Sequence, residues 1–155
     1  KAAYLENFII DLAKTCDKEG YNVISVSKCL SADVNVGFDP CFPDVVDHKN
    51  CAYLNNGVVL TKYTGSRGKS GTSDASAEFI GEISRMLNSA GIIWQTGELG
   101  KVDLGGGGTV SMFVARLGMD VLDIGVPVLS MHSPFETTSK LDIYMMYKAF
   151  CEFYK

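Results

Sequence analysis

The chain has 155 residues, of which 46% are hydrophobic and 21% are charged. This balance is typical of one globular domain with a real core, so we expect a single domain over residues 1–155. The formal net charge of -4 disfavours a nucleic-acid partner, because a polyanionic backbone selects basic surfaces. The apolar runs are much shorter than the roughly 20 residues that cross a bilayer, so we also expect no membrane partner.

The five cysteines are scattered, and no two of them have the C-x-x-C spacing of a zinc knuckle. In a domain of this size we expect them to be free thiols in a reducing compartment, which points to a cytoplasmic protein.

The first half of the chain predicts two helices and two strands. Apolar residues recur at helical spacing over residues 2–15, and a short buried strand follows over 28–33 with Asp33 as its last residue. Residues 35–56 are rich in Pro and Asn and predict a loop. A β-branched strand over 58–63 then leads through a glycine-rich turn into a helix over 74–89.

The second half repeats this alternation. A strand at 92–95 precedes a long loop that ends in four glycines, Gly105, Gly106, Gly107 and Gly108, followed by Thr109. The remaining expected elements are a helix over 109–117, apolar strands at 121–124 and 126–131, and a closing helix over 138–154.

Strands alternating with helices predict an α/β layered domain, with a largely parallel or mixed central sheet flanked by helices. In such sheets ligands bind at the carboxyl ends of strands. Asp33, the loop after Tyr63, the loop before Thr109 and His132 all follow or end strands, so we expect them to converge on one edge.

Taken one by one, these candidates leave alternatives open. Asp33 needs a partner, which a loop hydrogen bond or a metal ion would both provide. His132 ends an apolar strand and is either a satisfied core residue or a ligand. The four glycines form either a flexible loop or the lining of a binding site, and the ordering entropy of such a run favours the lining.

The segment Gly68-Lys69-Ser70 follows a strand and precedes a helix, as a phosphate-binding P-loop does. The motif requires a glycine five positions before Gly68, where this chain has Tyr63. A nucleotide-binding protein that uses Lys69 is therefore a minor alternative.

Several blocks taken together resemble the aspartyl aminopeptidase and aminopeptidase I family of zinc exopeptidases, especially its clostridial-type bacterial members. The blocks are Ser31-Ala32-Asp33, residues 57–62, residues 101–109 and the long run 116–133 that ends in Met-His-Ser. The resemblance covers nearly the whole chain. It implies a zinc exopeptidase-like fold, peptide substrates and homo-oligomers.

The resemblance also implies a site with two zinc ions, at which a zinc-activated water releases N-terminal amino acids. It assigns Asp33 to one zinc as a terminal carboxylate and His132 to the other as an imidazole. Lys62 and the segment Gly105–Thr109 align with segments that line the family's substrate pocket. Eukaryotic aspartyl aminopeptidases have a histidine where this chain has Val36, so a neutral N-terminal residue is as good a substrate candidate as an acidic one.

The family's other ligands and its general base precede the Ser-Ala-Asp block, and residues 1–32 contain no Glu-Glu or His-x-Asp. We therefore expect the chain to be the C-terminal portion of a catalytic domain. Its general base would lie upstream of Lys1, and the chain alone would be inactive. The main alternative from another class is a non-catalytic binding or assembly module with the same fold.

Overall fold

The computed structural model describes residues 3–65, 67, 69–101 and 103–155, and its described part forms a five-stranded mixed sheet between helices. The strands are β1 (Lys28–Val36), β2 (Val58–Thr61), β3 (Trp94–Thr96), β4 (Asp120–Leu129) and β5 (Thr137–Thr138). Their order is β1-β4-β2-β3, and β5 pairs with β4 outside this path. The α/β layered architecture predicted from the sequence is confirmed.

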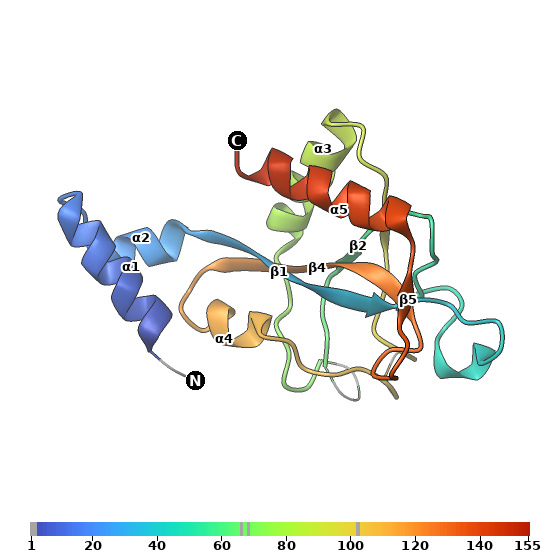
Figure 1. Ribbon diagram of the computed structural model, residues 1–155. Helices are drawn as coiled ribbons and strands as arrows, with labels where there is room; N and C mark the ends of the chain where they lie inside the picture. The colour runs from blue at the N-terminus through green and yellow to red at the C-terminus, as the bar shows by residue number, and fades with distance from the viewer. Residues whose placement is uncertain (1–2, 66, 68, 102) are drawn as a thin grey trace.

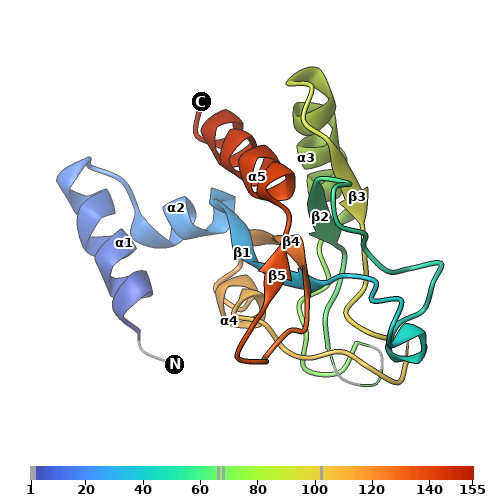
Figure 2. The ribbon, with the colours of Figure 1, turned by 45° about the vertical axis from the view of Figure 1, so that its right-hand side comes forward.

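The helices lie on both faces of this sheet (Figure 1). They are α1 (Tyr4–Thr15), α2 (Gly20–Val26), α3 (Ala77–Ser89), α4 (Ser111–Ala115) and α5 (Lys140–Phe153), with a short 3-10 helix, η1 (Pro43–Val45). α3 and α5 cover one face and α4 lies against the other, whereas α1 and α2 pack on each other beyond the start of β1 (Figures 1 and 2).

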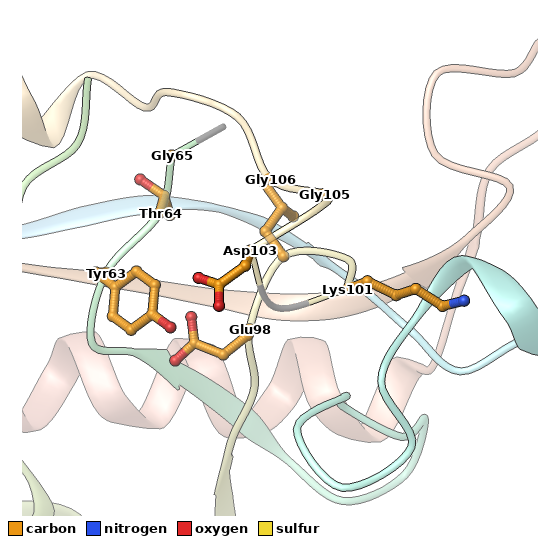
Figure 3. A pocket seen from close by; sticks show the side chains of 9 residues that line it. Tyr63, Thr64, Gly65, Glu98, Lys101, Asp103, Gly105 and Gly106 are labelled. Atoms are coloured by element: carbon orange, nitrogen blue, oxygen red, sulfur yellow. The ribbon is translucent and has the colours of Figure 1, made fainter. Parts of the chain in front are cut away.

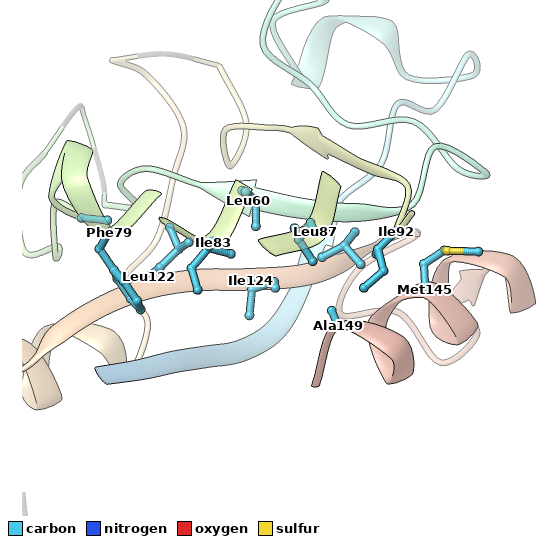
Figure 4. Packing of buried hydrophobic residues seen from close by; sticks show 11 residues of the cluster. Leu60, Phe79, Ile83, Leu87, Ile92, Leu122, Ile124, Met145 and Ala149 are labelled. Carbon is cyan, nitrogen blue, oxygen red and sulfur yellow. The ribbon is translucent and has the colours of Figure 1, made fainter. Parts of the chain in front are cut away.

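The hydrophobic core lies between the sheet and the helices α3 and α5 (Figure 4). Phe79, Ile83 and Leu87 are four residues apart, so they form one buried face of α3. The hydroxyl of Ser76 accepts a hydrogen bond from the backbone N–H of Phe79 and caps this helix. From the sheet, Leu60, Leu122 and Ile124 point toward α3 and α5.

The strand directions overturn one expectation. β1 pairs with β4 in parallel and β2 pairs with β3 in parallel, but β2 is antiparallel to β4. Thr61, near the end of β2, therefore lies opposite Asp123, near the start of β4. His132 follows the far end of β4, on the order of 20 Å away along the strand. The expected convergence of all four candidates on one carboxyl edge was wrong, because β2 and β3 run opposite to β1 and β4.

Three local predictions also need correction. β1 continues to Val36, so Asp33 lies inside the strand and not at its end. The two apolar runs around Gly125 form one strand, β4. The helix α2 was not predicted; it begins at Gly20 and buries Ile24.

None of the helices in the described part of the chain combines the length and the apolar character that a bilayer span needs.

Candidate active-site cavity

A row of polar side chains crosses the sheet on the face opposite the hydrophobic core. Ser31 in β1 pairs with Asp123 in β4, and Asp123 pairs with Thr61 in β2. Because side chains alternate along a strand, Ser31, Asp33 and Asn35 point to this same face. The neighbouring Leu30, Leu122 and Leu60 point to the other face and reach the core. Alternation thus separates a polar surface from the packed interior.

This polar face forms the floor of a small cavity. Its walls come from β1, β2, β4 and two loops: Ser31, Asp33, Val34, Asn35, Thr61, Thr64, Leu99, Thr109, Asp123, Ile124 and Gly125. The cavity therefore brings two predicted site residues together, Asp33 and Thr109. The Asp33 carboxylate is exposed, and its Oδ1 accepts the backbone N–H of Val34 at 2.8 Å.

Two buried polar groups of this cavity are unpartnered in the described part of the chain, the Oγ of Ser31 and the Oδ1 of Asn35. These residues are only 4% and 5% exposed. The amide of Asn35 donates to Thr61 Oγ1 at 2.6 Å, and Thr61 Oγ1 donates to the carbonyl of Gly97 at 2.9 Å. An unpaired buried polar atom costs free energy, so the cavity is suited to a polar or charged ligand.

Asp123 lies in the same row but is satisfied by protein. Its two carboxylate oxygens accept hydrogen bonds from the hydroxyls of Thr109 and Ser111, each at 2.8 Å. These contacts tie the end of the glycine-rich loop and the start of α4 to the sheet. Asp123 therefore positions the loop, and Thr109 has both a structural contact and a place in the cavity wall.

The glycine-rich loop is tightly folded. The backbone N–H of Gly105 donates to the carbonyl of Lys101 at 2.7 Å. A Cβ at Gly105 would lie 2.8 Å from the backbone nitrogen of Lys101, so only glycine fits there. The loop forms one side of a second cavity, and Gly105 and Gly106 both line it.

Carboxylates and a tyrosine face this second cavity (Figure 3). The side chains of Tyr63, Glu98 and Asp103 point toward one another, whereas the ammonium group of Lys101 points away (Figure 3). Burial raises the pKa of Glu98 from 4.5 to about 7, and the nearby positive charge of Lys69 opposes this shift without cancelling it. Glu98 was not predicted from the sequence, because the sequence of a loop does not indicate whether a carboxyl group in it is half-buried.

Lys62 and Lys69 are both engaged outside the two cavities. Their ammonium groups pair with the carboxylate of Asp74, and Lys62 also donates to the carbonyl of Ala75 at 2.9 Å. These hydrogen bonds lower the pKa of Asp74. Lys69 also lies 5.0 Å from the centre of the Tyr63 ring. Gly68, from the P-loop-like segment, lies outside the described residues.

His132 lies apart from the Asp33 cavity, in the turn between β4 and β5. It has a positive φ of 67°, which is uncommon for a residue other than glycine, and its backbone N–H donates to the carboxylate of Glu136. Its side chain is exposed and is not part of the cavity wall.

The residues that could bind a metal ion decide whether this chain can hold zinc by itself. Asp33 and His132 are chemically suitable zinc donors, and a tetrahedral zinc site takes four ligands. Within the described residues, no three His, Cys, Asp or Glu side chains lie close enough together to share an ion. The described residues can therefore supply single ligands to zinc, but they do not form a complete zinc site.

Comparison with known proteins identifies the family. The profile of the aminopeptidase I zinc metalloprotease family (M18) matches residues 1–154. The chain belongs to the M18 family. A relative from Clostridium acetobutylicum, a probable M18 family aminopeptidase 1, is 47% identical over 152 residues, which cover 93% of this chain and 32% of the relative.

Solved M18 structures share the fold. The crystal structure of aminopeptidase I from Clostridium acetobutylicum is 44% identical with a TM-score of 0.91, over 100% of this chain and 34% of that one. The M18-family aminopeptidase from Thermotoga maritima is 41% identical with a TM-score of 0.93, over 98% of this chain and 35% of that one. The chain thus spans about a third of the length of these M18 proteins. The resemblance seen in the sequence is confirmed.

Proposed function

We propose that the complete gene product containing this chain is a two-zinc aminopeptidase that releases N-terminal amino acids from peptides. The observation that carries this proposal is the cavity around Asp33, with its two unpaired buried polar atoms, in a chain of the M18 zinc metalloprotease family. Unpaired acceptors beside an exposed carboxylate favour a ligand that is positively charged or rich in hydrogen-bond donors.

In this proposal Asp33 holds one zinc ion through its carboxylate, and His132 holds the other through its imidazole. Zinc, when bound, supplies a Lewis acid that makes water a nucleophile at neutral pH. The remaining ligands and the general base come from outside this chain. That division agrees with the lack of a cluster of three donors among the described residues.

The chain's other residues bind and position the substrate. The backbone of Gly105 and Gly106 lines the second cavity, and the lack of side chains there lets a ligand approach the main chain closely. Thr109, anchored on Asp123, fixes the end of this loop. Lys62 reaches the peptide only when its contact with Asp74 opens.

Two broader features belong to the same proposal, a cytoplasmic location and assembly into homo-oligomers. The five cysteines are free thiols, as expected in a reducing compartment. The outer face of α1 exposes Tyr4, Leu5, Phe8 and Leu12, an apolar surface of the kind that protein interfaces cover. A nucleotide-binding role for Lys69 is not favoured, because its ammonium group pairs with Asp74.

Zinc analysis and peptidase assays of the complete gene product test the proposal. We expect about two zinc ions per subunit in the wild type. Asp33→Ala and His132→Ala should each bind less zinc and have at least a hundredfold lower activity. Loss of a metal ligand, or of the residues that hold a ligand in place, lowers metal affinity or activity by about this factor. Asp11→Ala, which removes an exposed carboxylate on α1, is the control and should leave both unchanged. Full zinc and full activity in either ligand variant would rule out its assignment.

A further inference from the structure

The two cavities described above have room for only a small group each. The volume of the Asp33 cavity is about 20 Å³ and that of the second cavity about 10 Å³, and a cavity needs roughly 10–15 Å³ to hold one water molecule. Most of a peptide substrate must therefore lie elsewhere. A groove of about 410 Å³, open to solvent, lies between the loop 43–49 and the residues Lys101 and Leu104. Its volume is within the range of small-ligand sites, about 300–1,000 Å³.

The groove shares a wall with the second cavity. Lys101 lines both of them. Its carbonyl accepts the backbone N–H groups of Leu104 and Gly105 at 3.2 and 2.7 Å, and the resulting turn has Gly105 on the cavity side and Leu104 on the groove side. The second cavity in turn shares Leu99 with the cavity of Asp33. The groove therefore continues the candidate site beyond the second cavity.

Hydrogen bonds within the chain hold the opposite wall of the groove in place. The carboxylate of Asp47 accepts the backbone N–H of Lys49 at 3.1 Å and the side-chain amide of Asn50 at 3.0 Å. The carbonyl of Asn50 accepts the backbone N–H of Glu98 at 2.6 Å, which ties this loop to a loop of the second cavity. The groove is therefore formed before a ligand arrives, as ligand sites usually are.

Apolar side chains line part of the groove. Pro43, Val46 and Leu104 belong to its walls. Val46 is buried, whereas Leu104 is 76% exposed. A ligand that covers Leu104 with an apolar group removes both surfaces from water, and this burial favours binding.

The charges of the groove select neither sign. Besides His48, its ionisable side chains are two acidic and two basic ones: Asp44, Asp47, Lys49 and Lys101. The ammonium group of Lys101 points away from the carboxylates of Glu98 and Asp103 (Figure 3). It can therefore donate to a backbone carbonyl of a peptide in the groove. A neutral apolar side chain on a peptide backbone matches both features.

We propose that this groove receives the leaving part of a peptide substrate and favours an apolar side chain at the third residue. In an extended peptide alternate side chains point the same way, so the third side chain faces the same wall as the first. Leu104 is the specificity-determining residue, and Lys101 holds the passing backbone. The inference rests on the proposed aminopeptidase function and adds to it a preference beyond the cleaved bond.

The test uses the complete gene product loaded with zinc and two tetrapeptides, X-Gly-Leu-Gly and X-Gly-Asp-Gly. X is the amino acid whose p-nitroanilide the wild type cleaves best, and this p-nitroanilide has no third residue. We expect kcat/KM to be about fivefold to thirtyfold higher for the leucine peptide than for the aspartate peptide, the range that partial burial of one leucine side chain gives. In Leu104→Ser this ratio should fall below about threefold, while kcat/KM for the p-nitroanilide stays within about twofold.

Two further variants separate the contacts. Lys101→Met keeps the aliphatic stem and should lower kcat/KM for both tetrapeptides by a similar factor, because the backbone that Lys101 contacts is the same in both. Leu141→Ser is the matched control, because Leu141 is an exposed leucine on α5, and it should change no substrate.

Several outcomes would overturn the inference. One is a wild type that cleaves the aspartate peptide as well as the leucine peptide, and another is a Leu104→Ser variant that keeps the wild-type ratio. An equal loss on the p-nitroanilide in Leu104→Ser is a third, since Leu104 would then act on the reacting end. If the wild type cleaves no amino-acid p-nitroanilide, the proposed function fails. Calorimetry with Ala-Gly-Leu-Gly and Ala-Gly-Asp-Gly then decides on the groove, and equal binding of the two rules the inference out.

Discussion

Asp33 and Gly125 lie opposite each other in the parallel pair β1–β4, and a Cβ at Gly125 would lie 2.5 Å from the carbonyl oxygen of Asp33. Real Cβ atoms do not approach backbone oxygens so closely, so the sheet in this form requires glycine at 125. Both residues line the same cavity. The missing side chain of Gly125 therefore determines where the backbone of Asp33 lies and leaves space beside its carboxylate.

We predict that Gly125→Ala lowers the free energy of unfolding by about 1–3 kcal/mol, the usual cost of inserting an atom into a packed site. β1 must shift to relieve the contact, so zinc content should fall as well. Chemical denaturation and metal analysis measure the two effects. Gly81→Ala is the control, because Gly81 lies inside α3 and alanine there should stabilise the protein slightly. Wild-type stability in Gly125→Ala would show that β1 accommodates a side chain freely.

Most of the fold could be predicted from the sequence, because its long elements have strong periodicity. In α3, apolar residues recur every four positions at Phe79, Ile83 and Leu87. The apolar runs on either side of Gly125 predicted strand structure where the central strand β4 lies. The direction of β2 could not be predicted. Strand patterns look the same in parallel and antiparallel neighbours, and only the path of the connecting loops decides between them.

The candidate site was predicted only in part for the same reason. Asp33 and Thr109 were expected near each other, and the structure brings them into one cavity. Ser31 and Asn35 were missed, although both alternate with Asp33 along β1 and a strict period of two would have placed them on its face. Glu98 gave no such signal, because its burial depends on the fold of a distant loop.

The carboxylate of Asp142 is predicted to be a large single contributor to stability. It is fully buried in the first turn of α5 and accepts the backbone N–H groups of Asn55 and Gly57 at 2.8 and 2.7 Å. Asp142→Ala leaves both donors unsatisfied, so we expect a loss of about 2–4 kcal/mol in the free energy of unfolding. Asp11→Ala, which breaks an exposed ion pair with Lys14, should cost less than about 1 kcal/mol. Similar losses in the two variants would contradict this prediction.

The pKa of Glu98 predicts how stability depends on pH. Burial raises this pKa from 4.5 to about 7, so between these values the folded state binds more protons than the unfolded state. The contribution of Glu98 to stability is therefore fully present below about pH 4.5 and is lost as the pH rises to about 7. We expect the difference in unfolding free energy between the wild type and Glu98→Gln to change over this window and to level off above it.

Denaturation curves at several pH values, for both proteins in one buffer series, measure this difference. Glu19→Gln provides the baseline, because its side chain is exposed and should follow the wild type throughout. A difference between wild type and Glu98→Gln that stays constant from about pH 4.5 to 7 would mean that the Glu98 carboxyl keeps an ordinary pKa.

Thr109 tests whether the glycine-rich loop is anchored through Asp123. The hydroxyls of Thr109 and Ser111 both donate to this buried carboxylate. Thr109→Val keeps the shape but removes one donor, so we expect a loss of about 1–3 kcal/mol in unfolding free energy. We also expect a higher KM for peptide substrates, because the loop is less well positioned. Thr109→Ser keeps the hydroxyl and should restore most of both. If valine keeps the wild-type stability and KM while serine loses them, the threonine methyl group fixes the loop by packing, and the hydrogen bond to Asp123 is not its anchor.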